Sequence, residues 1–315
     1  MINWGILGLG RMGSTFAYAI KETSNSKLIG IGSKSGKTFE NYNSKSYEEI
    51  INDKNIDAIY ISTLNNTHIE LIKKIIDSKK KILCEKPVSI SLEDLEEVQK
   101  IITNKKIQLY EAIAYYCHPQ TLLVLEMINN DEIGEIKNIE SNFGFKAKFN
   151  SKSRLFDKSL GGGCIFDLAC YPLSFFMLFT KNPEKIILKS KEIDYSKNNI
   201  DEDAKAILEY ENNIEGKIHV SFKSNLKNTC TIHGTKGSIK IINPWLPDKD
   251  ATIEISSNKH FYIKTVNSKL SIYANQIESV SKSFLDLSKK LNLFDIEKSL
   301  INMKLMSNWL NNKST

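Results

Sequence analysis

The feature that most constrains this sequence is a glycine-rich loop close to its start. Residues 8–13 read GLGRMG, the pattern G-x-G-x-x-G, and they follow the apolar run INWGIL at 2–7 and open a stretch with helical spacing. In such a strand–turn–helix the first glycine permits a tight turn, the second lets the backbone approach a pyrophosphate, and the third lets the helix pack on the strand. The sequence therefore predicts a dinucleotide-binding loop whose cofactor contacts are Gly8, Gly10, Arg11, Met12 and Gly13.

The first part of the chain has the pattern of a doubly wound sheet. Short apolar runs alternate with amphipathic helical stretches, which favours parallel strands. The expected strands are 2–7, 27–33, 57–63, 81–85 and 107–111, and the expected helices are 11–22, 67–78 and 91–103. A chain of 315 residues is long enough for two domains. We predict a Rossmann dinucleotide-binding domain, of the α/β class, over residues 1–118.

Residues 119–315 have a different pattern. Runs with strand character fill 184–265, and no helical stretch separates them, which favours a mainly antiparallel, open sheet. The other expected elements are a strand at 134–149 and helices at 119–129, 165–179, 273–290 and 295–312. We predict that 119–315 form an α+β domain for substrate binding and oligomerisation.

Charge and cysteine usage exclude several classes of protein. The net charge is +6, but the lysines are interleaved with acids, which indicates a solvated surface rather than a nucleic-acid site. The excess positive charge suits an anionic cofactor. Five cysteines form no C-x-x-C pair and mostly lie in apolar runs, which indicates a reducing compartment, and we expect a cytoplasmic protein.

Metal and membrane functions find no support in the sequence. The five histidines show no H-E-x-x-H or other metal-ligand spacing, so we expect no metal site. No run approaches the roughly 18 apolar residues of a membrane span, and the first residues already belong to a folding motif. We therefore expect neither a signal peptide nor an association with membranes.

The end of the second expected strand bears on which nicotinamide cofactor is bound. NAD-specific loops carry an acid about 20 residues further on, which binds the ribose 2′-hydroxyl. Here the strand ends in Gly32-Ser33-Lys34-Ser35, and no acid stands there. A hydroxyl and a cation suit a 2′-phosphate, so we predict NADP(H) rather than NAD(H), with Ser33 and Lys34 as contacts. The alternative is that Lys34 points into solvent.

A second glycine-rich stretch, GGGCIFDLACYP at 161–172, precedes two polar side chains. Glycines let a backbone approach a ligand or another segment closely. Asp167 and Tyr171 are four residues apart and share one face of a helix. Pro172 cannot donate to the carbonyl of Leu168, so we expect a kink there that aims both side chains into a cleft. The alternative is a helix start at which the two side chains make ordinary surface contacts.

These motifs together resemble one family. With the N-terminal loop, the segment Cys84-Glu85-Lys86-Pro87 and the pattern G-G-G-x-x-x-D-x-x-x-Y resemble the Gfo/Idh/MocA oxidoreductases over nearly the whole chain. Tyr171 followed by Pro172 is similar to the branch that contains glucose–fructose oxidoreductase and the dihydrodiol and xylose dehydrogenases. Glu111-Ala112 and His118-Pro119 also resemble that branch. The chain departs from it at Tyr116, where the branch has Arg, and at Leu64, where it has Pro.

The resemblance implies an NAD(P)-dependent oxidoreductase that moves a hydride between nicotinamide and a secondary alcohol or ketone, or a hemiacetal or lactone, of a sugar or polyol. Tyr171 would be the proton donor and acceptor, and the Lys86 ammonium would lower the pKa of its phenol. Asp167 would bind a substrate hydroxyl or orient Tyr171. Glu85 would contact ribose or nicotinamide, and Pro87 would shape the turn through a cis bond.

Further contacts are implied at the edge of the first sheet and in the second domain. Thr63, Asn65 and His68 follow the third strand, at the edge where α/β sheets bind ligands, and the family places cofactor contacts there. His68 could equally be a helix-start residue without a ligand. Arg154 would reach a phosphate or a substrate anion unless it is simply solvated, and Tyr116 would line the pocket or pack.

Partners and alternative functions follow from the same resemblance. The family associates through its C-terminal sheet, so we expect a homodimer or homotetramer. One alternative function is reduction of a keto group on a nucleotide-linked sugar in deoxysugar biosynthesis. Another, from a different class, is a non-catalytic NADP-binding sensor or regulator. Retention of Lys86, Asp167 and Tyr171 argues against the sensor.

Overall fold

The structure, a computed structural model, describes residues 1–257, 260–286, 288 and 291–311. The chain divides into two compact units. The first contains Met1–Cys117 and Lys269–Leu300, and the second contains His118–Ser268 and Ile301–Thr315. The segment Lys269–Leu300, which the sequence analysis assigns to the second domain, thus belongs to the first unit.

Packing of the returning segment explains this assignment. It contains helix α7 (Ile272–Leu285), which contacts strands β1 (Ile2–Leu7) and β2 (Ser26–Gly32). The fully buried Trp4 donates from Nε1 to the Ser281 hydroxyl at 3.0 Å and packs its ring near that of Phe284. The apolar face of α7 is therefore covered by the first sheet, although more than 250 residues separate the two in sequence.

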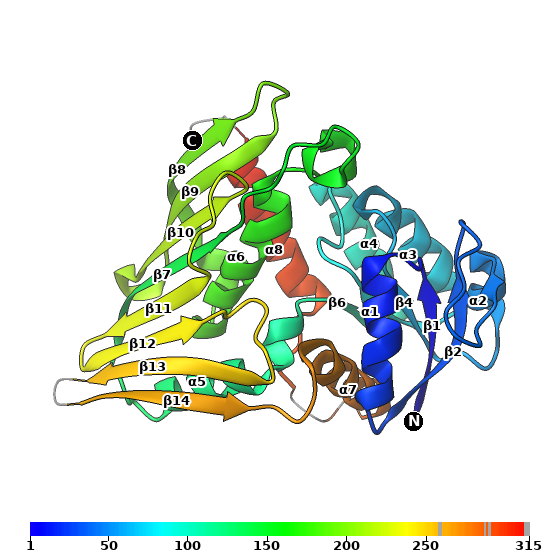
Figure 1. The fold of residues 1–315 in the computed structure, drawn as a ribbon, viewed down its shortest axis with the longest axis horizontal. Coiled ribbons are helices and arrows are strands. Elements are labelled where there is room, and N and C mark those ends of the chain that lie inside the picture. The colour runs from blue at the N-terminus through cyan, green and yellow to red at the C-terminus, as the bar shows by residue number, and fades with distance from the viewer. Residues whose placement is uncertain (258–259, 287, 289–290, 312–315) are drawn as a thin grey trace. The chain divides into compact units, whose positions relative to one another are not determined.

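The first unit is built on a six-stranded parallel sheet with the order β3-β2-β1-β4-β5-β6, the order of a Rossmann fold (Figure 1). Beyond β1 and β2, its strands are β3 (Ser44–Lys45), β4 (Ala58–Ile61), β5 (Lys81–Cys84) and β6 (Leu109–Glu111). Its N-terminal helices are α1 (Arg11–Ala19), α2 (Tyr47–Asn52), α3 (His68–Asp77) and α4 (Leu92–Lys105). All five expected strands are confirmed. The sequence analysis missed β3 and α2, two short elements without a long apolar pattern.

Burial on both faces explains why the strands of the first sheet read as unbroken apolar runs. Every residue of β4 is buried, and Ile6, Leu7 and Ile61 have no exposed surface. Helix α4 begins where the Ser91 hydroxyl accepts a hydrogen bond from the backbone N–H of Asp94 at 3.2 Å. Helices α1, α3 and α4 thus follow the carboxyl ends of β1, β4 and β5, at one edge of the sheet.

The second unit is built on an eight-stranded sheet with the order β14-β13-β12-β11-β7-β10-β9-β8. Its strands are β7 (Ile136–Gly144), β8 (Ile187–Tyr195), β9 (Asp201–Glu209), β10 (Glu215–Ser221), β11 (Thr229–Gly234), β12 (Gly237–Ile242), β13 (Asp250–Ser257) and β14 (Phe261–Asn267). All neighbouring pairs are antiparallel except β7 with β10, which is parallel. The predicted mainly antiparallel sheet is confirmed.

Helices cover one face of this sheet (Figure 1). They are α5 (Pro119–Asn129), α6 (Cys170–Phe176) and the end of α8 (Ile296–Leu310). The side chain of Asn302 on α8 donates to the carbonyl of Cys170 on α6 at 3.1 Å. At the start of α5, the buried His118 accepts a hydrogen bond from the backbone N–H of Gln120, so this histidine is a helix cap.

One helical segment is more apolar than the sequence analysis expected. Over Lys158–Phe179, 22 residues, an 18-residue window has a mean hydropathy of 1.5, which is long and apolar enough for a membrane span. It is the one such segment among the described residues, and 78% of that window is buried inside the fold. The expectation that no run reaches this apolarity is therefore wrong. A helix in the core of a large unit is apolar on all sides, as a membrane-spanning helix is.

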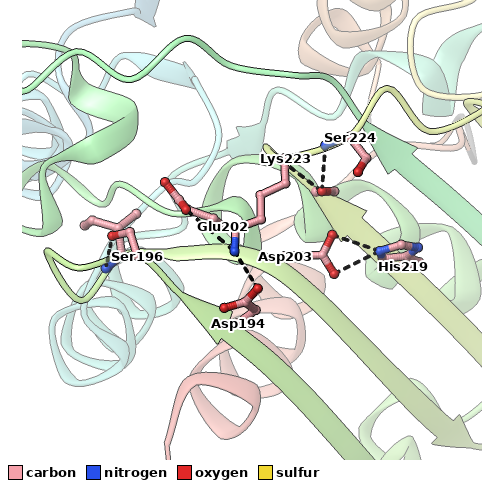
Figure 2. Close-up of polar contacts among 9 residues, drawn as sticks. Asp194, Ser196, Glu202, Asp203, His219, Lys223 and Ser224 are labelled. Atoms are coloured by element: carbon pink, nitrogen blue, oxygen red, sulfur yellow. Dashed lines mark hydrogen bonds and ion pairs between the residues drawn. The ribbon is translucent and has the colours of Figure 1, made fainter.

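The opposite face of the second sheet is polar. Nε2 of His219 on β10 lies 3.0 and 3.1 Å from the two carboxylate oxygens of Asp203 on β9, and Lys223 pairs with Asp194 and lies 4.0 Å from Glu202 (Figure 2). A shallow pocket of about 350 Å³ lies over β7, β8, β9 and β10. Alternation of apolar and polar residues along the strands thus produces one helix-covered face and one charged face.

Candidate active site

The N-terminal glycine loop has the backbone geometry that the motif predicts. Gly8 has a φ of +96°, and its N–H donates to the carbonyl of Gly32 at 2.9 Å. A Cβ on Gly8 would lie 2.9 Å from the carbonyl oxygen of Ser62, and a Cβ on Gly13 would overlap the carbonyl oxygen of Gly8. The first and third glycines are therefore required by the fold itself, through the turn and the helix–strand contact.

The middle glycine has no such internal role. A Cβ on Gly10 would meet no described atom within 4 Å, so the space in front of this residue is open. Gly10 is the N-cap of α1, and no side chain of the described residues caps that helix. The first N–H groups of α1 are thus available to an anion, as a pyrophosphate at a helix N-terminus requires. The loop fits a dinucleotide, with the exposed Arg11 beside it.

A cavity of about 760 Å³ lies over the end of β2 and the starts of α2 and α3. It brings together Ser33, Lys34 and Thr63, three of the predicted cofactor contacts. The charged side chains that line it are Lys34, Lys45, Lys74, Glu48 and Glu70. The Lys34 ammonium lies 5.5 Å from the centroid of the Tyr47 ring. Lys74 pairs with Glu70 and Lys45 with Asp53, so a phosphate in this cavity would be bound chiefly by Lys34 and the hydroxyl groups.

The segment after β4 contains a buried amide. Asn65 is 7% exposed, and its Nδ2 has no hydrogen-bond partner among the described residues. A buried donor without a partner is rare in proteins and suits a ligand that supplies an acceptor. The neighbouring Leu64 is 48% exposed, and the Thr63 hydroxyl lies 2.7 Å from that of Thr67.

His68 lies between this segment and the one that follows β5. The imidazole is fully buried, with Nδ1 3.0 Å from the carbonyl oxygen of Pro87 and Nε2 3.3 Å from that of Thr63. A neutral imidazole can donate to only one of these two oxygens. His68 thus joins the segment after β4 to the segment after β5, and its contacts are those of a residue that positions both.

The segment Glu85-Lys86-Pro87 follows β5 directly, at the same edge of the sheet. Glu85 accepts a hydrogen bond from the Tyr60 hydroxyl and, at 3.3 Å, from the backbone N–H of Lys86. The Lys86–Pro87 peptide bond is cis, as predicted. Lys86 is half-buried. Since the carboxyl ends of β1, β4 and β5 are neighbours, the glycine loop, Asn65 and Lys86 follow three adjacent strands at one edge.

A further carboxyl group, that of Glu111, binds the backbone of the segment that follows β5. Glu111, the last residue of β6, is 3% exposed and accepts a hydrogen bond from the backbone N–H of Val88 at 3.2 Å. Burial raises the pKa of Glu111 from 4.5 to about 7, against the lowering effects of Ser299, Val88 and the Lys86 ammonium. The residue assists the loop by holding its backbone and lies within electrostatic reach of Lys86.

In the second unit, the stretch from Gly161 to Pro172 is not a plain α-helix. A π-helical turn spans Ile165–Ala169 and leads into α6. The helical segment continues through Pro172, which is the third residue of α6. A π-helical turn, a form often found at functional sites, thus lies just before the proline. The kink expected at Pro172 stays a prediction.

Asp167 and Tyr171 both come from this stretch. The buried Asp167 accepts a hydrogen bond from Nη2 of Arg154 at 2.9 Å. Tyr171 is half-buried, and its ring meets that of Phe143 edge to face, with centroids 5.5 Å apart. Arg154 is thus neither simply solvated nor isolated: it is the partner of Asp167. The second unit thus brings Arg154 and Asp167 into contact, and Tyr171 lies four residues after Asp167 on the same stretch.

Comparisons with known proteins agree with both halves of this description. Residues 2–113 match the model of the Gfo/Idh/MocA oxidoreductase family with an NAD-binding Rossmann fold, and residues 121–240 match that of the Gfo/Idh/MocA C-terminal domain. The chain belongs to the Gfo/Idh/MocA oxidoreductase family. The resemblance stated from the sequence motifs is confirmed, and so is the class of enzyme, an oxidoreductase that uses a nicotinamide dinucleotide.

Individual relatives extend this match. An uncharacterized oxidoreductase of Rhizobium meliloti is 32% identical over 211 residues, which are 65% of this chain and 61% of that protein. The trans-1,2-dihydrobenzene-1,2-diol dehydrogenase of Sus scrofa is 25% identical over 259 residues, 78% of this chain and 76% of that enzyme. The chain thus spans about three fifths of the first relative and about three quarters of the second.

The fold is also similar to that of a solved structure. The crystal structure of KijD10, a 3-ketoreductase from Actinomadura kijaniata in complex with NADP and TDP-benzene, matches with a TM-score of 0.85. The match covers 97% of this chain and 96% of that one, at 18% sequence identity. At this identity the likeness concerns the fold.

One residue predicted to line a substrate pocket in this Gfo/Idh/MocA member lies elsewhere. Tyr116 is fully buried in the first unit, with ring centroids 5.2 Å from both Tyr115 and Phe294. Its backbone carbonyl accepts a hydrogen bond from the side chain of Asn292 at 2.8 Å. Tyr116 therefore packs, the alternative that the sequence analysis left open, and the structure does not bring its side chain to the surface.

Two residues near the site had no role assigned from the sequence. Glu111 was named only as part of the family resemblance, although a carboxylate at the end of the apolar strand IQLYE is a detectable signal of a specific partner. Asp201, described below, gave no local signal. It stands in the acidic run IDED, and its contact lies thirty-six residues away in sequence.

Proposed function

We propose that this protein is an NADP(H)-dependent oxidoreductase that interconverts a secondary alcohol or hemiacetal of a sugar or polyol with the ketone or lactone. The observation that carries the proposal is the ion pair between the buried Asp167, on the stretch that leads to Tyr171, and the half-buried Arg154. A carboxylate that is held in place by a guanidinium can accept a hydrogen bond from one hydroxyl of the substrate. The phenol of Tyr171 can donate a proton to, or accept one from, the oxygen on the neighbouring carbon of the substrate.

The proposed roles of the residues follow from their chemistry. A bound nicotinamide supplies or accepts the hydride. Tyr171 gives a proton to the carbonyl oxygen or takes it from the hydroxyl. An ammonium favours a phenolate and therefore lowers the pKa of a phenol, which is the role that we propose for Lys86. Glu85 and Asn65 would hold the ribose and nicotinamide end of the cofactor, and His68 and Glu111 would fix the segments that carry them.

A preference for NADP(H) over NAD(H) is the finer part of the proposal. It is supported by the cavity at the end of β2, where Ser33 and Lys34 lie with two further lysines. A 2′-phosphate carries more charge than a 2′-hydroxyl and gains more from these cations. The presence of NADP in the KijD10 structure agrees with this preference but belongs to that protein.

The diol dehydrogenase among the relatives suggests the class of substrate. The substrate in its name carries two neighbouring hydroxyls on a ring, as pyranoses and cyclic polyols do. The likeness to KijD10 favours the alternative, reduction of a nucleotide-linked keto sugar, by fold alone. The two are separated by offering free sugars and cyclic polyols with NADP⁺, and TDP-linked keto sugars with NADPH.

A non-catalytic sensor would bind the cofactor without turning over any substrate. Tyr171→Phe discriminates this function from catalysis, because it removes one hydroxyl and leaves the ring packed on Phe143. Loss of turnover with unchanged binding of NADPH supports the enzyme. Binding without turnover for both the unsubstituted chain and the variant supports the sensor.

We also propose a homodimer or homotetramer that associates through the polar face of the eight-stranded sheet. The support is the shallow pocket over β7 to β10 and the row of ion pairs beside it. Light scattering after size exclusion, at low and at high salt, tests this association, since screening weakens exposed ion pairs. All five cysteines are buried thiols, which supports a reducing compartment such as the cytoplasm.

A further inference from the structure

A buried aspartate outside the proposed catalytic residues contacts the start of the stretch that leads to Tyr171. Asp201 is the first residue of β9 and is 5% exposed. Its Oδ2 accepts a hydrogen bond from the backbone N–H of Ile165 at 2.7 Å. Ile165 opens the π-helical turn, so a side chain of the sheet holds the first amide of that turn.

The same carboxylate explains the last of the three consecutive glycines. A Cβ on Gly163 would overlap Oδ1 of Asp201 and lie 2.6 Å from its Cγ. Gly163 also has a φ of +110°, which side chains other than that of glycine rarely adopt. A Cβ on Gly162 would lie 2.7 Å from the carbonyl oxygens of both Arg154 and Asp157. The glycines thus let the chain pass between the Arg154 loop and the carboxylate of Asp201.

Several groups surround this carboxylate. The Cys164 thiol and backbone N–H groups hydrogen-bond to it, the Lys158 ammonium acts on it from the surface loop, and the Tyr195 phenol lies within its electrostatic reach. The negative charge of Asp203, further along β9, contributes to raising the pKa of the Cys164 thiol. Burial raises the pKa of Asp201 from 3.8 to about 6, against these hydrogen bonds. The carboxylate is therefore largely charged at neutral pH and loses its charge in mild acid.

The contact is close in sequence to the proposed catalytic side chains. Asp167 is two residues after Ile165, and its N–H donates to the carbonyl of Gly163 at 3.2 Å. Tyr171 follows four residues later, on the first turn of α6. A shift at Ile165 would therefore move Asp167 directly and tilt the turn that leads to Tyr171. Misplacement of a reacting group by about 1 Å can cost about a hundredfold in rate.

We infer that Asp201 is a positioning residue, which sets where Asp167 and Tyr171 lie by holding the N–H of Ile165 and by occupying the space that a side chain at Gly163 would need. This inference rests on the proposed function, in which Asp167 and Tyr171 contact the substrate. Asp201 itself acts through its hydrogen bonds with the N–H of Ile165 and the thiol of Cys164.

The test compares Asp201→Asn with Asp203→Asn. Both variants change one carboxylate to an amide on β9, but Asp203 pairs with His219 on the opposite, polar face (Figure 2). For each purified full-length variant we would measure kcat, KM and the Kd of NADPH, and the hydrogen exchange of the backbone amides at 164–170 by mass spectrometry. The exchange measurement needs no substrate and decides whether the turn is anchored by Asp201.

We expect Asp201→Asn to lower kcat by about 10- to 100-fold with KM changed less than about threefold. The Kd of NADPH should stay unchanged, and exchange at 164–170 should accelerate. In the unsubstituted enzyme we expect kcat to fall on the acid side near about pH 6, and this fall should weaken or disappear in the variant. Asp203→Asn should leave kcat, its pH profile and the exchange unaltered.

Other outcomes overturn the inference in distinguishable ways. A lowered Tm with an unaltered kcat and pH profile in Asp201→Asn would make Asp201 a merely structural residue. Unaltered exchange would overturn the anchoring itself. If the unsubstituted protein turns over no sugar, polyol or keto sugar, the proposed function fails and the catalytic part of this inference fails with it, whereas the exchange data still judge the contact.

A second variant approaches the same contact from the other side. Gly163→Ala adds a methyl group that collides with the carboxylate and leaves Asp201 itself intact. We expect the same faster exchange and the same loss of kcat. Gly134→Ala is the matched control, since φ there is likewise positive, at +72°, and a Cβ would likewise collide with a neighbour, the Thr235 hydroxyl, but the collision involves neither Asp201 nor residues 164–170. Equal effects of the two variants would overturn the inference.

Discussion

The guanidinium of Arg154 donates to the buried carboxylate of Asp167 at 2.9 Å, thirteen residues away in sequence. Arg154→Met keeps much of the side-chain volume and removes the charge. We expect kcat/KM to fall by about 10- to 100-fold, because a buried carboxylate without its partner is misplaced or neutralised. The Kd of NADPH should not change, since the glycine loop belongs to the first unit.

Lys152→Met is the control for this variant. Lys152 is an exposed cation of the same loop, so its loss tests a general effect of charge on the substrate. Arg154→Lys should recover part of the activity, although an ammonium lacks the planar fork of donors. Equal losses in Arg154→Met and Lys152→Met would show that the ion pair has no special role.

Lys34→Ala tests the preference for NADP(H). The variant should weaken NADPH binding about tenfold, or about 1.4 kcal/mol, because a 2′-phosphate loses a charged partner. NADH binding should change less than about twofold on the same reasoning. Fluorescence titration of both cofactors gives the two Kd values. Lys37→Ala is a matched control, an exposed lysine that does not line the cavity. A parallel loss for both cofactors would mean that Lys34 contacts something other than the 2′-phosphate.

Tyr171→Phe tests the proton transfer. General acid–base catalysis typically contributes about 10²- to 10⁴-fold, so kcat should fall within that range while NADPH binding persists. A Lys86→Met, Tyr171→Phe double-mutant cycle measures the proposed coupling of these residues. Because residues that act as a unit are strongly non-additive, the double variant should lose little more than the worse single variant. Additive losses would contradict a shared proton-transfer step.

Two buried carboxyl groups predict an unusual pH dependence of stability. The pKa values of Glu111 and Asp201 are raised to about 7 and about 6 by burial. A raised pKa in the folded state contributes stability that is present at low pH and is lost as the pH rises through the folded pKa. The free energy of unfolding should therefore increase from about pH 8 to about pH 5, by about 2 to 3 kcal/mol for Glu111 and by about 1 to 2 kcal/mol for Asp201.

Glu111→Gln isolates one of these contributions. Denaturant unfolding as a function of pH should show a flatter slope between about pH 7 and about pH 5 in this variant. Glu126→Gln, on the exposed face of α5, should retain the full slope. The same slope in both variants would mean that Glu111 does not carry the titration.

The sequence predicted those parts of the fold that local patterns determine. Apolar strands buried on both faces and the Gly8–Gly13 loop each depend on residues that are close in the chain, and both are found in the structure. Return of α7 to the first unit could not be predicted, because its partner Trp4 lies at the opposite end of the chain. A helical pattern says which face is apolar but not which sheet covers it.

The candidate site shows the same division. The spacing predicted one face for Asp167 and Tyr171, but nothing in it indicated the π-helical turn or the contact of Asp201 with Ile165. The pairing of Arg154 with Asp167 was likewise invisible, because nothing local distinguishes this arginine from a solvated one. A residue such as Asp201, which acts by binding the backbone of a distant segment, does not form a recognisable sequence motif.

The central claim is that this family member transfers a hydride to or from a sugar-like alcohol, with Tyr171 moving the proton. The most direct measurement follows NADPH by its absorbance while the protein and NADP⁺ are offered D-xylose, myo-inositol and trans-cyclohexane-1,2-diol, with Tyr171→Phe in parallel. The account predicts NADPH formation with at least one of these compounds and its near-complete loss in the variant. Tight NADPH binding without turnover, or the same turnover in the variant, would contradict it.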